Sequence, residues 1–137
     1  METIRTIINP TPEQIDIFCN GLCQYNAQFV LRKFEPFSIA LENEEGEIVG
    51  GIKGESFWGR LHIEMLWINQ DYRKQGLGKK LIAMAEIVAK ERKCKGIDLD
   101  TMTFQAPGFY EKMGFRQVGE LPNYDNEFKR IYYAKDF

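Results

Sequence analysis

The sequence predicts a mixed α+β domain, and three observations lead to that class. Segments 12–30 and 76–93 repeat apolar residues at helical spacing. Several shorter segments alternate apolar and polar residues or form short apolar runs, as strands do. The predicted order is strand, helix, three strands, helix, strand, helix and two strands. Such an order is typical of helices packed on a sheet that is not built from repeated βα units.

The N-terminal segment is predicted to form a strand and then a helix. Residues 3–8, Thr-Ile-Arg-Thr-Ile-Ile, have the composition of a strand, and Asn9-Pro10 ends the run. Three signals then mark a helix start: Thr11 can cap the helix, Pro12 suits its first position, and Gln14 completes a capping box. Apolar residues follow at helical spacing to about residue 30 and predict one apolar face: Ile15, Phe18, Leu22, Tyr25 and Phe29.

Three strands are predicted next. Segments 37–41 and 47–53 flank a polar stretch that contains Gly46, which predicts an antiparallel hairpin with this glycine in the turn. The following strand, at about 60–69, begins with alternation and ends in the continuous apolar run 65–68. This change predicts a strand that becomes covered on both faces along its length.

The second half of the chain begins with a helix at 76–93, whose predicted apolar stripe comprises Leu77, Leu81, Met84, Ala85 and Val88. The remaining predicted elements are a strand at 96–101, a short helix at 105–113, and a closing antiparallel pair at 115–121 and 128–135. Gly114 suits a left-handed cap on the short helix. Since no repeat or linker interrupts the chain, we expect a single domain over residues 1–137.

Composition narrows the class of function. The net charge of −2, from 18 Lys+Arg against 20 Asp+Glu, favours neither nucleic-acid binding nor a polybasic membrane anchor. No apolar run approaches the roughly 18–20 residues that span a bilayer, and residues 1–5 lack the pattern of a signal peptide. Three cysteines without a framework spacing indicate reduced thiols and predict a cytoplasmic protein. With one histidine and no ligand pattern, no metal site is predicted.

Residues 73–80 carry the strongest functional signal. Their sequence, Arg-Lys-Gln-Gly-Leu-Gly-Lys-Lys, joins an apolar strand to the N-terminus of a helix. Unpaired backbone N–H groups and the positive end of the helix dipole make such a junction an anion site. Gly76 and Gly78 let an oxyanion approach the backbone, and the four cations add attraction.

Two common nucleotide-binding loops do not fit this segment. A Walker A loop needs Ser or Thr after Gly-Lys, but Lys80 follows Gly78-Lys79. A dinucleotide-binding loop would need a glycine at the position of Leu81. The remaining alternative to an anion site is an ordinary glycine turn with solvated lysines.

The loop instead resembles a known signature. Arg73-x-x-Gly76-x-Gly78 is similar to the Arg/Gln-x-x-Gly-x-Gly/Ala pattern of the GNAT acetyltransferase superfamily. Downstream, the run Phe-Tyr-Glu-Lys-Met-Gly-Phe at 109–115 resembles the family's Leu/Phe-Tyr-x-x-x-Gly-Phe segment. One helix and one strand separate the two motifs, as in the family, and the matched region covers about residues 62–121.

The resemblance implies a fold and a cosubstrate. The fold would be a mixed, mostly antiparallel, twisted sheet of about seven strands, flanked by helices and splayed at a bulge in the fourth strand. The cosubstrate would be acetyl-CoA, with its pyrophosphate on the loop amides. The family often has Asn where this chain has Thr103, so Thr103 or Gln105 is expected to take that contact. The residues implied at acetyl-CoA are Leu66, Trp67, Ile68, Arg73, Lys74, Gln75, Gly76, Leu77, Gly78, Lys79, Thr103, Gln105, Phe109, Tyr110 and Lys112.

Acetyl transfer to an amine needs a neutral amine, donors for the oxyanion and a proton for the departing thiolate. By resemblance, Tyr110 protonates the thiolate, and a free N–H at Leu66 or Trp67 binds the oxyanion; the alternative for Tyr110 is a packing role. His62 and Glu64 alternate on one strand and so share a face. Glu64 is the first candidate for the general base, with His62 as its partner or substitute. The alternative is that both only line a solvated sheet face.

The predicted function is an N-acetyltransferase in which a primary amine attacks acetyl-CoA directly within a ternary complex. The alternative is a non-catalytic acyl-CoA-binding or sensing module on the same fold. Tyr110 and Glu64 together favour the enzyme, because a sensor needs neither. The acceptor is expected to be a small molecule or peptide, and its candidate contacts are Phe57, Trp58, Tyr124 and Asp125. Whether the chain forms a homodimer stays open.

Overall fold

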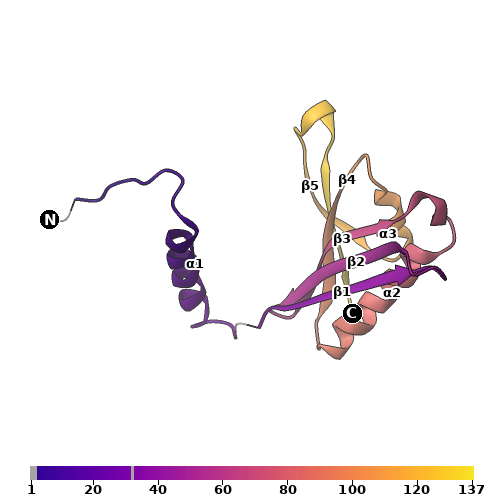
Figure 1. Ribbon diagram of the computed structural model, residues 1–137, viewed down its shortest axis with the longest axis horizontal. Coiled ribbons are helices and arrows are strands. Elements are labelled where there is room, and N and C mark those ends of the chain that lie inside the picture. The colour runs from indigo at the N-terminus through magenta and orange to yellow at the C-terminus, as the bar shows by residue number, and fades with distance from the viewer. Residues whose placement is uncertain (1–2, 32) are drawn as a thin grey trace. The chain divides into compact units, whose positions relative to one another are not determined.

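The computed structural model describes residues 3–31 and 33–137, which form two compact units (Figure 1). The first unit contains the N-terminal helix, and the second contains a sheet with two further α-helices. The expectation of one domain over residues 1–137 stays a prediction.

The first unit confirms the predicted helix start. Helix α1 spans Pro12–Asn26, and Thr11 and Gln14 form the capping box: the Thr11 amide donates to Gln14 Oε1 (2.8 Å) and the Gln14 amide to Thr11 Oγ1 (3.2 Å). The helix ends four residues earlier than the apolar spacing suggests. The strand predicted at 3–8 is wrong, because residues 3–7 have no regular structure and no strand of the described residues pairs with them. A strand sequence alone does not form a strand without a neighbour to bond.

The second unit is built on a sheet of six strands, one fewer than predicted, in the order β1-β2-β3-β4-β6-β5. Neighbouring strands are antiparallel except for β3 and β4, which are parallel. The mixed, mostly antiparallel sheet is therefore confirmed. The strands are β1 (Glu35–Glu42), β2 (Ile48–Phe57), β3 (Arg60–Ile68), β4 (Gly96–Met102), β5 (Arg116–Leu121) and β6 (Arg130–Asp136).

Two helices accompany the sheet. Helix α2 (Leu77–Glu91) packs on β2, β3 and β4, and its buried side chains are Leu81, Ile82, Ala85 and Ala89. They join the sheet residues of the core, among them Ile52, Leu61, Ile63, Ile97, Leu99 and Tyr133. Helix α3 (Pro107–Lys112) is short and contacts β5, and Gly114 follows it with a φ of 92°, as predicted for its cap. The segment between β3 and α2 includes a 3-10 turn, η1 (Gln70–Tyr72).

The sheet splits along β3. Its first residues, Arg60 to Ile63, pair with β4 in parallel, and the pairing then stops. On its other side β3 pairs with β2 along its whole length, but Lys53 faces Met65 while Gly54 faces Ile63, so Glu64 is an extra, bulged residue. The bulge predicted in this strand is confirmed, although the strand is the third of the sheet because residues 3–8 form none.

Candidate active site

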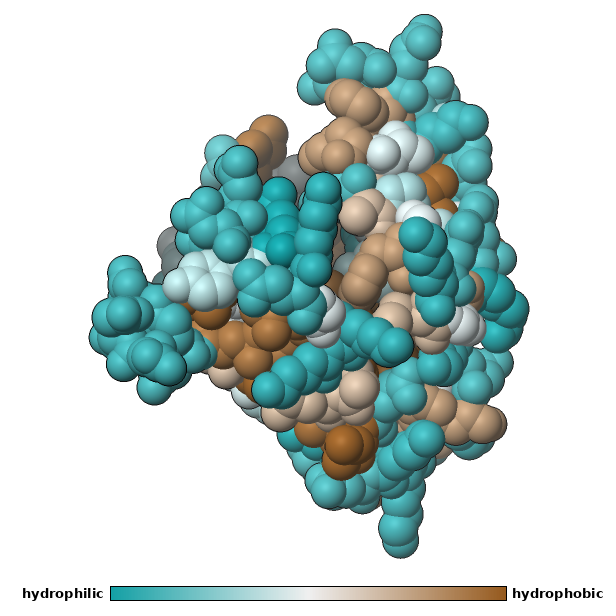
Figure 2. All heavy atoms as spheres, turned by 90° about the vertical axis from the view of Figure 1, so that its right-hand side faces the viewer, coloured by the Kyte–Doolittle hydropathy of each residue, from teal (hydrophilic) through white to brown (hydrophobic). Residues whose placement is uncertain are grey.

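A cleft of about 1210 Å³ opens where β3 and β4 diverge. Its walls come from the second half of β3, the end of β4, the loop before α2, helix α3 and the segment before β6. Figure 2 views the molecule from the side on which α2 and α3 lie in Figure 1, where apolar surface in brown and tan is hollowed between hydrophilic side chains in teal. The cleft thus lies at the place where a bulge leaves one strand edge without a partner.

The loop that ends in α2 forms one wall of the cleft. Arg73 holds it against β3, since its Nε donates to the carbonyl oxygen of Ile68 (3.0 Å). Gly76 is the N-cap of α2 in a left-handed conformation (φ 77°), and the first bond within the helix runs from the Lys80 amide to its carbonyl (3.0 Å). The amide N–H groups of residues 77–79 therefore have no acceptor within the helix. Arg73, Lys74 and Lys79 also line the cleft, so this wall suits a polyanion.

Gly78 has a different role from the one its position in the motif suggests. A Cβ at this residue would lie 3.2 Å from the ring of Phe109, whereas a Cβ at Gly76 would meet nothing within 4 Å. Gly78 therefore lets α3 pack against the first turn of α2. Gly76 supplies the left-handed turn and the open space above the amides.

Helix α3 brings the two sequence motifs together at the cleft. Tyr110 lines it, and its ring packs against Phe109, Phe115 and Tyr133 at centroid distances of 5.1, 5.9 and 5.9 Å. Burial raises the pKa of the Tyr110 hydroxyl, because the phenolate would lose solvation. The hydroxyl, protonated at neutral pH as in any tyrosine, is available as a proton donor.

The other predicted acetyl-CoA contacts divide into two groups. Those that line the cleft are Leu66, Trp67, Ile68, Arg73, Lys74, Gly76, Leu77, Gly78, Lys79, Gln105, Phe109 and Tyr110. Gln75, Thr103 and Lys112 lie outside its lining. The Thr103 hydroxyl accepts a hydrogen bond from the Lys129 amide (3.1 Å), and Gln105 Oε1 accepts from Thr101 Oγ1 (2.9 Å). Of the two candidates for the missing Asn, the geometry brings only Gln105 to the cleft.

Glu64 and His62, the candidate bases, differ in their surroundings. Glu64, the bulged residue, lines the cleft and pairs with Lys53, its Oε2 lying 2.7 Å from Lys53 Nζ. His62 lies outside the cleft lining and donates from Nδ1 to Oδ1 of Asp98 (2.7 Å). The hydrogen bond to Asp98 raises the pKa of His62 despite partial burial, and more distant Asp100 and Glu64 add to the effect.

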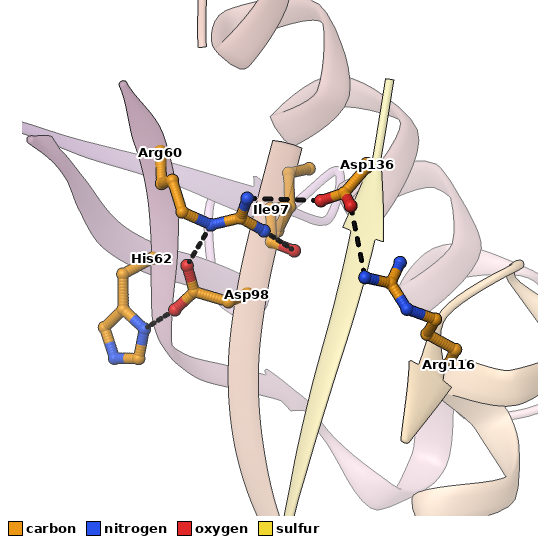
Figure 3. A network of polar contacts seen from close by, with 6 residues as sticks. All are labelled: Arg60, His62, Ile97, Asp98, Arg116 and Asp136. Carbon is orange, nitrogen blue, oxygen red and sulfur yellow. Dashed lines mark hydrogen bonds and ion pairs between the residues drawn. The ribbon is translucent and has the colours of Figure 1, made fainter. Parts of the chain in front are cut away.

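The Asp98 carboxylate belongs to a chain of ion pairs across the sheet (Figure 3). Arg60 donates from Nε to Asp98 Oδ2 and from Nη1 to Asp136 Oδ1, each at 3.1 Å, and Arg116 Nη2 lies 3.1 Å from Asp136 Oδ2. Burial would raise the pKa of Asp98, but hydrogen bonds from His62 and Arg60 outweigh it and lower that pKa. The chain joins β3, β4, β6 and β5 at the end where the strands remain paired.

Asp98 and Asp100 were not predicted as site residues. The alternation in β4 could have indicated them, because Ile97, Leu99 and Thr101 are buried and the two carboxylates must face the opposite side of the sheet. Asp100 lines the cleft and pairs with Arg130, whose Nε lies 2.8 Å from Asp100 Oδ1. Arg130 comes from β6, so the sequence alone gave no reason to join them.

The four candidate acceptor contacts do not come together. Tyr124 lines the cleft, and Asp125 follows it outside the lining. Phe57 and Trp58 lie at the β2–β3 turn, at the end of β3 opposite to the cleft, where they pack with Phe34 at centroid distances of 5.2 and 5.9 Å. Trp58 adopts a φ of 50° in this turn.

The split sheet, the glycine loop at a helix N-terminus and the adjoining tyrosine define an acetyltransferase. The model of the acetyltransferase (GNAT) family matches residues 1–115, and the chain belongs to this family. The predicted family and fold class are therefore confirmed. Among the described residues, no helix is long and apolar enough to cross a membrane, and no group of three His, Cys, Asp or Glu side chains is arranged to hold a metal ion.

Three bacterial acetyltransferases are among the proteins similar to this chain. The chain is 40% identical to blasticidin-S acetyltransferase of Streptomyces morookaense over 94 residues, which covers 68% of this chain and 69% of that protein. The crystal structure of an acetyltransferase from Bacillus cereus superposes with a TM-score of 0.90 at 34% identity, covering 97% of this chain and 98% of that one. A putative streptothricin acetyltransferase from Bacillus anthracis, crystallised with acetyl coenzyme A, superposes with a TM-score of 0.69 at 29% identity, covering 80% and 67%.

Proposed function

We propose that the protein is an acetyl-CoA-dependent N-acetyltransferase that transfers the acetyl group directly to a primary amine in a ternary complex. The observation that carries the proposal is the position of the split in the sheet. The cleft is lined by the start of α2, by the unpaired edge of β3 and by Tyr110. The start of α2 suits a diphosphate, and the unpaired edge offers backbone groups along an extended arm.

The chain's own groups fit the binding of acetyl-CoA. The amides of residues 77–79 and the charges of Arg73, Lys74 and Lys79 match a diphosphate. Beyond the bulge, β3 bonds only to β2, so alternate N–H and C=O groups of residues 65–67 point to the side that β4 has left, whereas the Ile68 carbonyl already accepts from Arg73 Nε. These groups can bond the amides of a pantetheine arm.

Acetyl-CoA supplies an activated acetyl group as a thioester, and the residues around it have separate tasks. An outward N–H of Leu66 or Trp67 stabilises negative charge on the carbonyl oxygen during attack. Tyr110, whose hydroxyl is protonated at neutral pH, donates a proton to the departing sulfur. Glu64 accepts a proton from the acceptor amine, which at neutral pH is mostly an ammonium ion with a pKa of about 10.4. His62 lies outside the cleft lining, and its hydrogen bond to Asp98 stabilises the part of the sheet where β3 and β4 are still paired.

A non-catalytic acyl-CoA-binding module is the alternative function. It would need the loop and the open strand edge but no proton donor or acceptor beside the thioester. Tyr110 and Glu64 both line the cleft, which favours the enzyme.

The binding part is tested by the thermal shift that acetyl-CoA produces, since a ligand of the native state raises the melting temperature. Gly76→Asp places a carboxylate against the diphosphate and should abolish the shift. Gly46→Asp is the matched control, because Gly46 has nearly the same φ (79° against 77°) and the same open surroundings but lies in the β1–β2 turn. Equal shifts in the two variants would refute the assignment of the loop.

The catalytic part is tested by the release of CoA thiol from acetyl-CoA with a panel of amines: blasticidin S, streptothricin, spermidine, glucosamine 6-phosphate and a lysine peptide. Blasticidin S is included because one relative is named blasticidin-S acetyltransferase. Turnover of at least one amine supports the enzyme. Acetyl-CoA binding without turnover of any of them would favour the binding module.

A further inference from the structure

We infer that Asp100 is an acceptor-binding residue that holds the ammonium group of the acceptor across the cleft from Glu64. The inference rests on the proposed function and adds how the acceptor is held: its reactive amine arrives as a cation and bonds Asp100. Its basis is the place of Asp100 in the split sheet, the way Arg130 fixes it, and the oxygen that this contact leaves free.

The register of the sheet places the two carboxylates opposite one another. The last parallel pair between β3 and β4 joins Ile63 to Leu99, and the next residues on the diverging strands are Glu64 and Asp100. Both line the cleft. They are therefore the first side chains on either side of the opening, where an amine must enter to reach a thioester held along β3.

The side chain of Asp100 points away from the core. Its neighbours Leu99 and Thr101 are only 3% and 5% exposed, and strand alternation turns Asp100 to the other face. Glu64 is on that face as well, since it pairs with Lys53, whose neighbour Ile52 belongs to the core. The two carboxylates thus reach the same face of the sheet from two strands.

Arg130, the first residue of β6, fixes Asp100. Its Nε donates to Asp100 Oδ1 (2.8 Å), and its guanidinium lies 5.3 Å from the ring centroid of Tyr132. Asp100 is thereby oriented through one oxygen, and its Oδ2 has no hydrogen-bond partner among residues 3–31 and 33–137. Glu64 is held in the same way through Oε2 by Lys53. Each carboxylate keeps one oxygen that an ammonium group can bond.

The two carboxylates then have different tasks. Glu64, on the strand that carries the thioester, takes the proton, whereas Asp100 remains bonded to the amine and sets its direction of attack. Hydrogen bonds to charged groups contribute about 1.5–3 kcal/mol, so losing one weakens binding by about 10- to 150-fold.

The test compares three variants on the same acceptor, with spermidine and blasticidin S as cationic probes. Asp100→Asn should raise the KM of a cationic acceptor about 10- to 150-fold and leave the KM of acetyl-CoA unchanged. Asp100→Glu, which retains the charge, should recover part of the loss. Asp136→Asn is the matched control, since this carboxylate pairs with Arg60 and Arg116 outside the cleft lining.

Each outcome decides the matter. An unchanged acceptor KM in Asp100→Asn, or an equal effect in Asp136→Asn, would overturn the role of Asp100 while leaving the acetyltransferase intact. A lowered kcat with recovery at high pH would make Asp100 the base and also overturn it. If the wild type acetylates no amine of the panel, the proposed function fails, and this inference fails with it.

Discussion

The two halves of β3 belong to one strand but have opposite surroundings. From Arg60 to Ile63 the strand is paired on both sides, and the Arg60–Asp98–His62 contacts join it to β4 (Figure 3). From Glu64 to Ile68 it is paired only with β2 and lines the cleft. The two halves also differ in sequence, because alternation in the first half gives way to the apolar run 65–68 in the second. The neighbour decides their exposure, since only the first half is paired with β4.

This difference teaches how a sheet can hold a binding site without losing its core. The bulge at Glu64 changes the alternation of β3, so that Leu61 and Ile63 before it and Leu66 and Ile68 after it all pack on the core side. The strand therefore stays anchored by α2 on one face. Only its edge toward β4 loses partners, and unpaired backbone groups must then find water or a ligand.

The largest effect should come from the unpaired half, at Tyr110. Tyr110→Phe keeps the ring and removes only the hydroxyl, so we expect kcat to fall by about 10²- to 10⁴-fold with little change in acetyl-CoA affinity. Tyr133→Phe is the matched control: this ring packs against Tyr110 at 5.9 Å, and its hydroxyl bonds Glu111 (3.1 Å) outside the cleft lining. Steady-state kinetics with a verified acceptor checks both. If the chemical step limits turnover and Tyr110→Phe still turns over at the wild-type rate, Tyr110 has only a packing role.

A smaller effect, on folding, is expected at the boundary between the halves. Gly54 faces Ile63 at the bulge, and a Cβ there would collide with the carbonyl oxygen of His62 and lie 2.8 Å from the Phe37 ring. Gly54→Ala should therefore lower the free energy of unfolding by about 1–3 kcal/mol or more, measured by denaturant unfolding. Gly108→Ala is the control, because a Cβ at Gly108 meets nothing within 4 Å. Equal stability of the two variants would mean that the bulge tolerates a side chain.

The smallest effect is expected in the paired half, at the His62–Asp98 contact. The hydrogen bond to Asp98 raises the pKa of His62, so its contribution to stability is complete below the unfolded value of about 6.5 and is lost as the pH rises through the folded value. The pKa of Asp98 is lowered, so the contribution of this carboxylate to stability is complete above its unfolded value and is lost as the pH falls through the folded value. The pair should therefore stabilise most between about pH 4 and 6.5.

His62→Gln should accordingly lower the melting temperature by about 1–3 °C at pH 5.5 and by less at pH 8.5, since partly exposed ion pairs contribute at most about 1 kcal/mol. The chain has a single histidine, so no other imidazole contributes to this difference. The melting temperatures are measured by circular dichroism. In the control variant Asp136→Asn, the decrease in melting temperature should be the same at pH 5.5 and at pH 8.5. A larger loss at pH 8.5 than at pH 5.5 would contradict the assigned sign.

The sequence by itself determined the local elements whose signals act within a few residues. The capping box at Thr11, the hairpin turn at Gly46, the left-handed Gly114 and the junction at Gly76 all appear as predicted, because backbone conformation and helix capping depend on near neighbours. The two motifs also predicted the family, since each combines a backbone requirement with a fixed spacing. The position of Tyr110 in the cleft followed from that family resemblance.

Only the tertiary structure decided which side chains from distant segments meet. The strand predicted at 3–8 is absent because a strand needs a partner that sequence periodicity cannot supply. The contact of Gly78 with Phe109, the pairing of Asp98 with His62 and that of Asp100 with Arg130 each join residues 30 or more positions apart. They depend on the strand order and on where β4 leaves β3. Alternation in the sequence predicts the face of the sheet on which each side chain lies. The register between strands decides which side chains it contacts on that face.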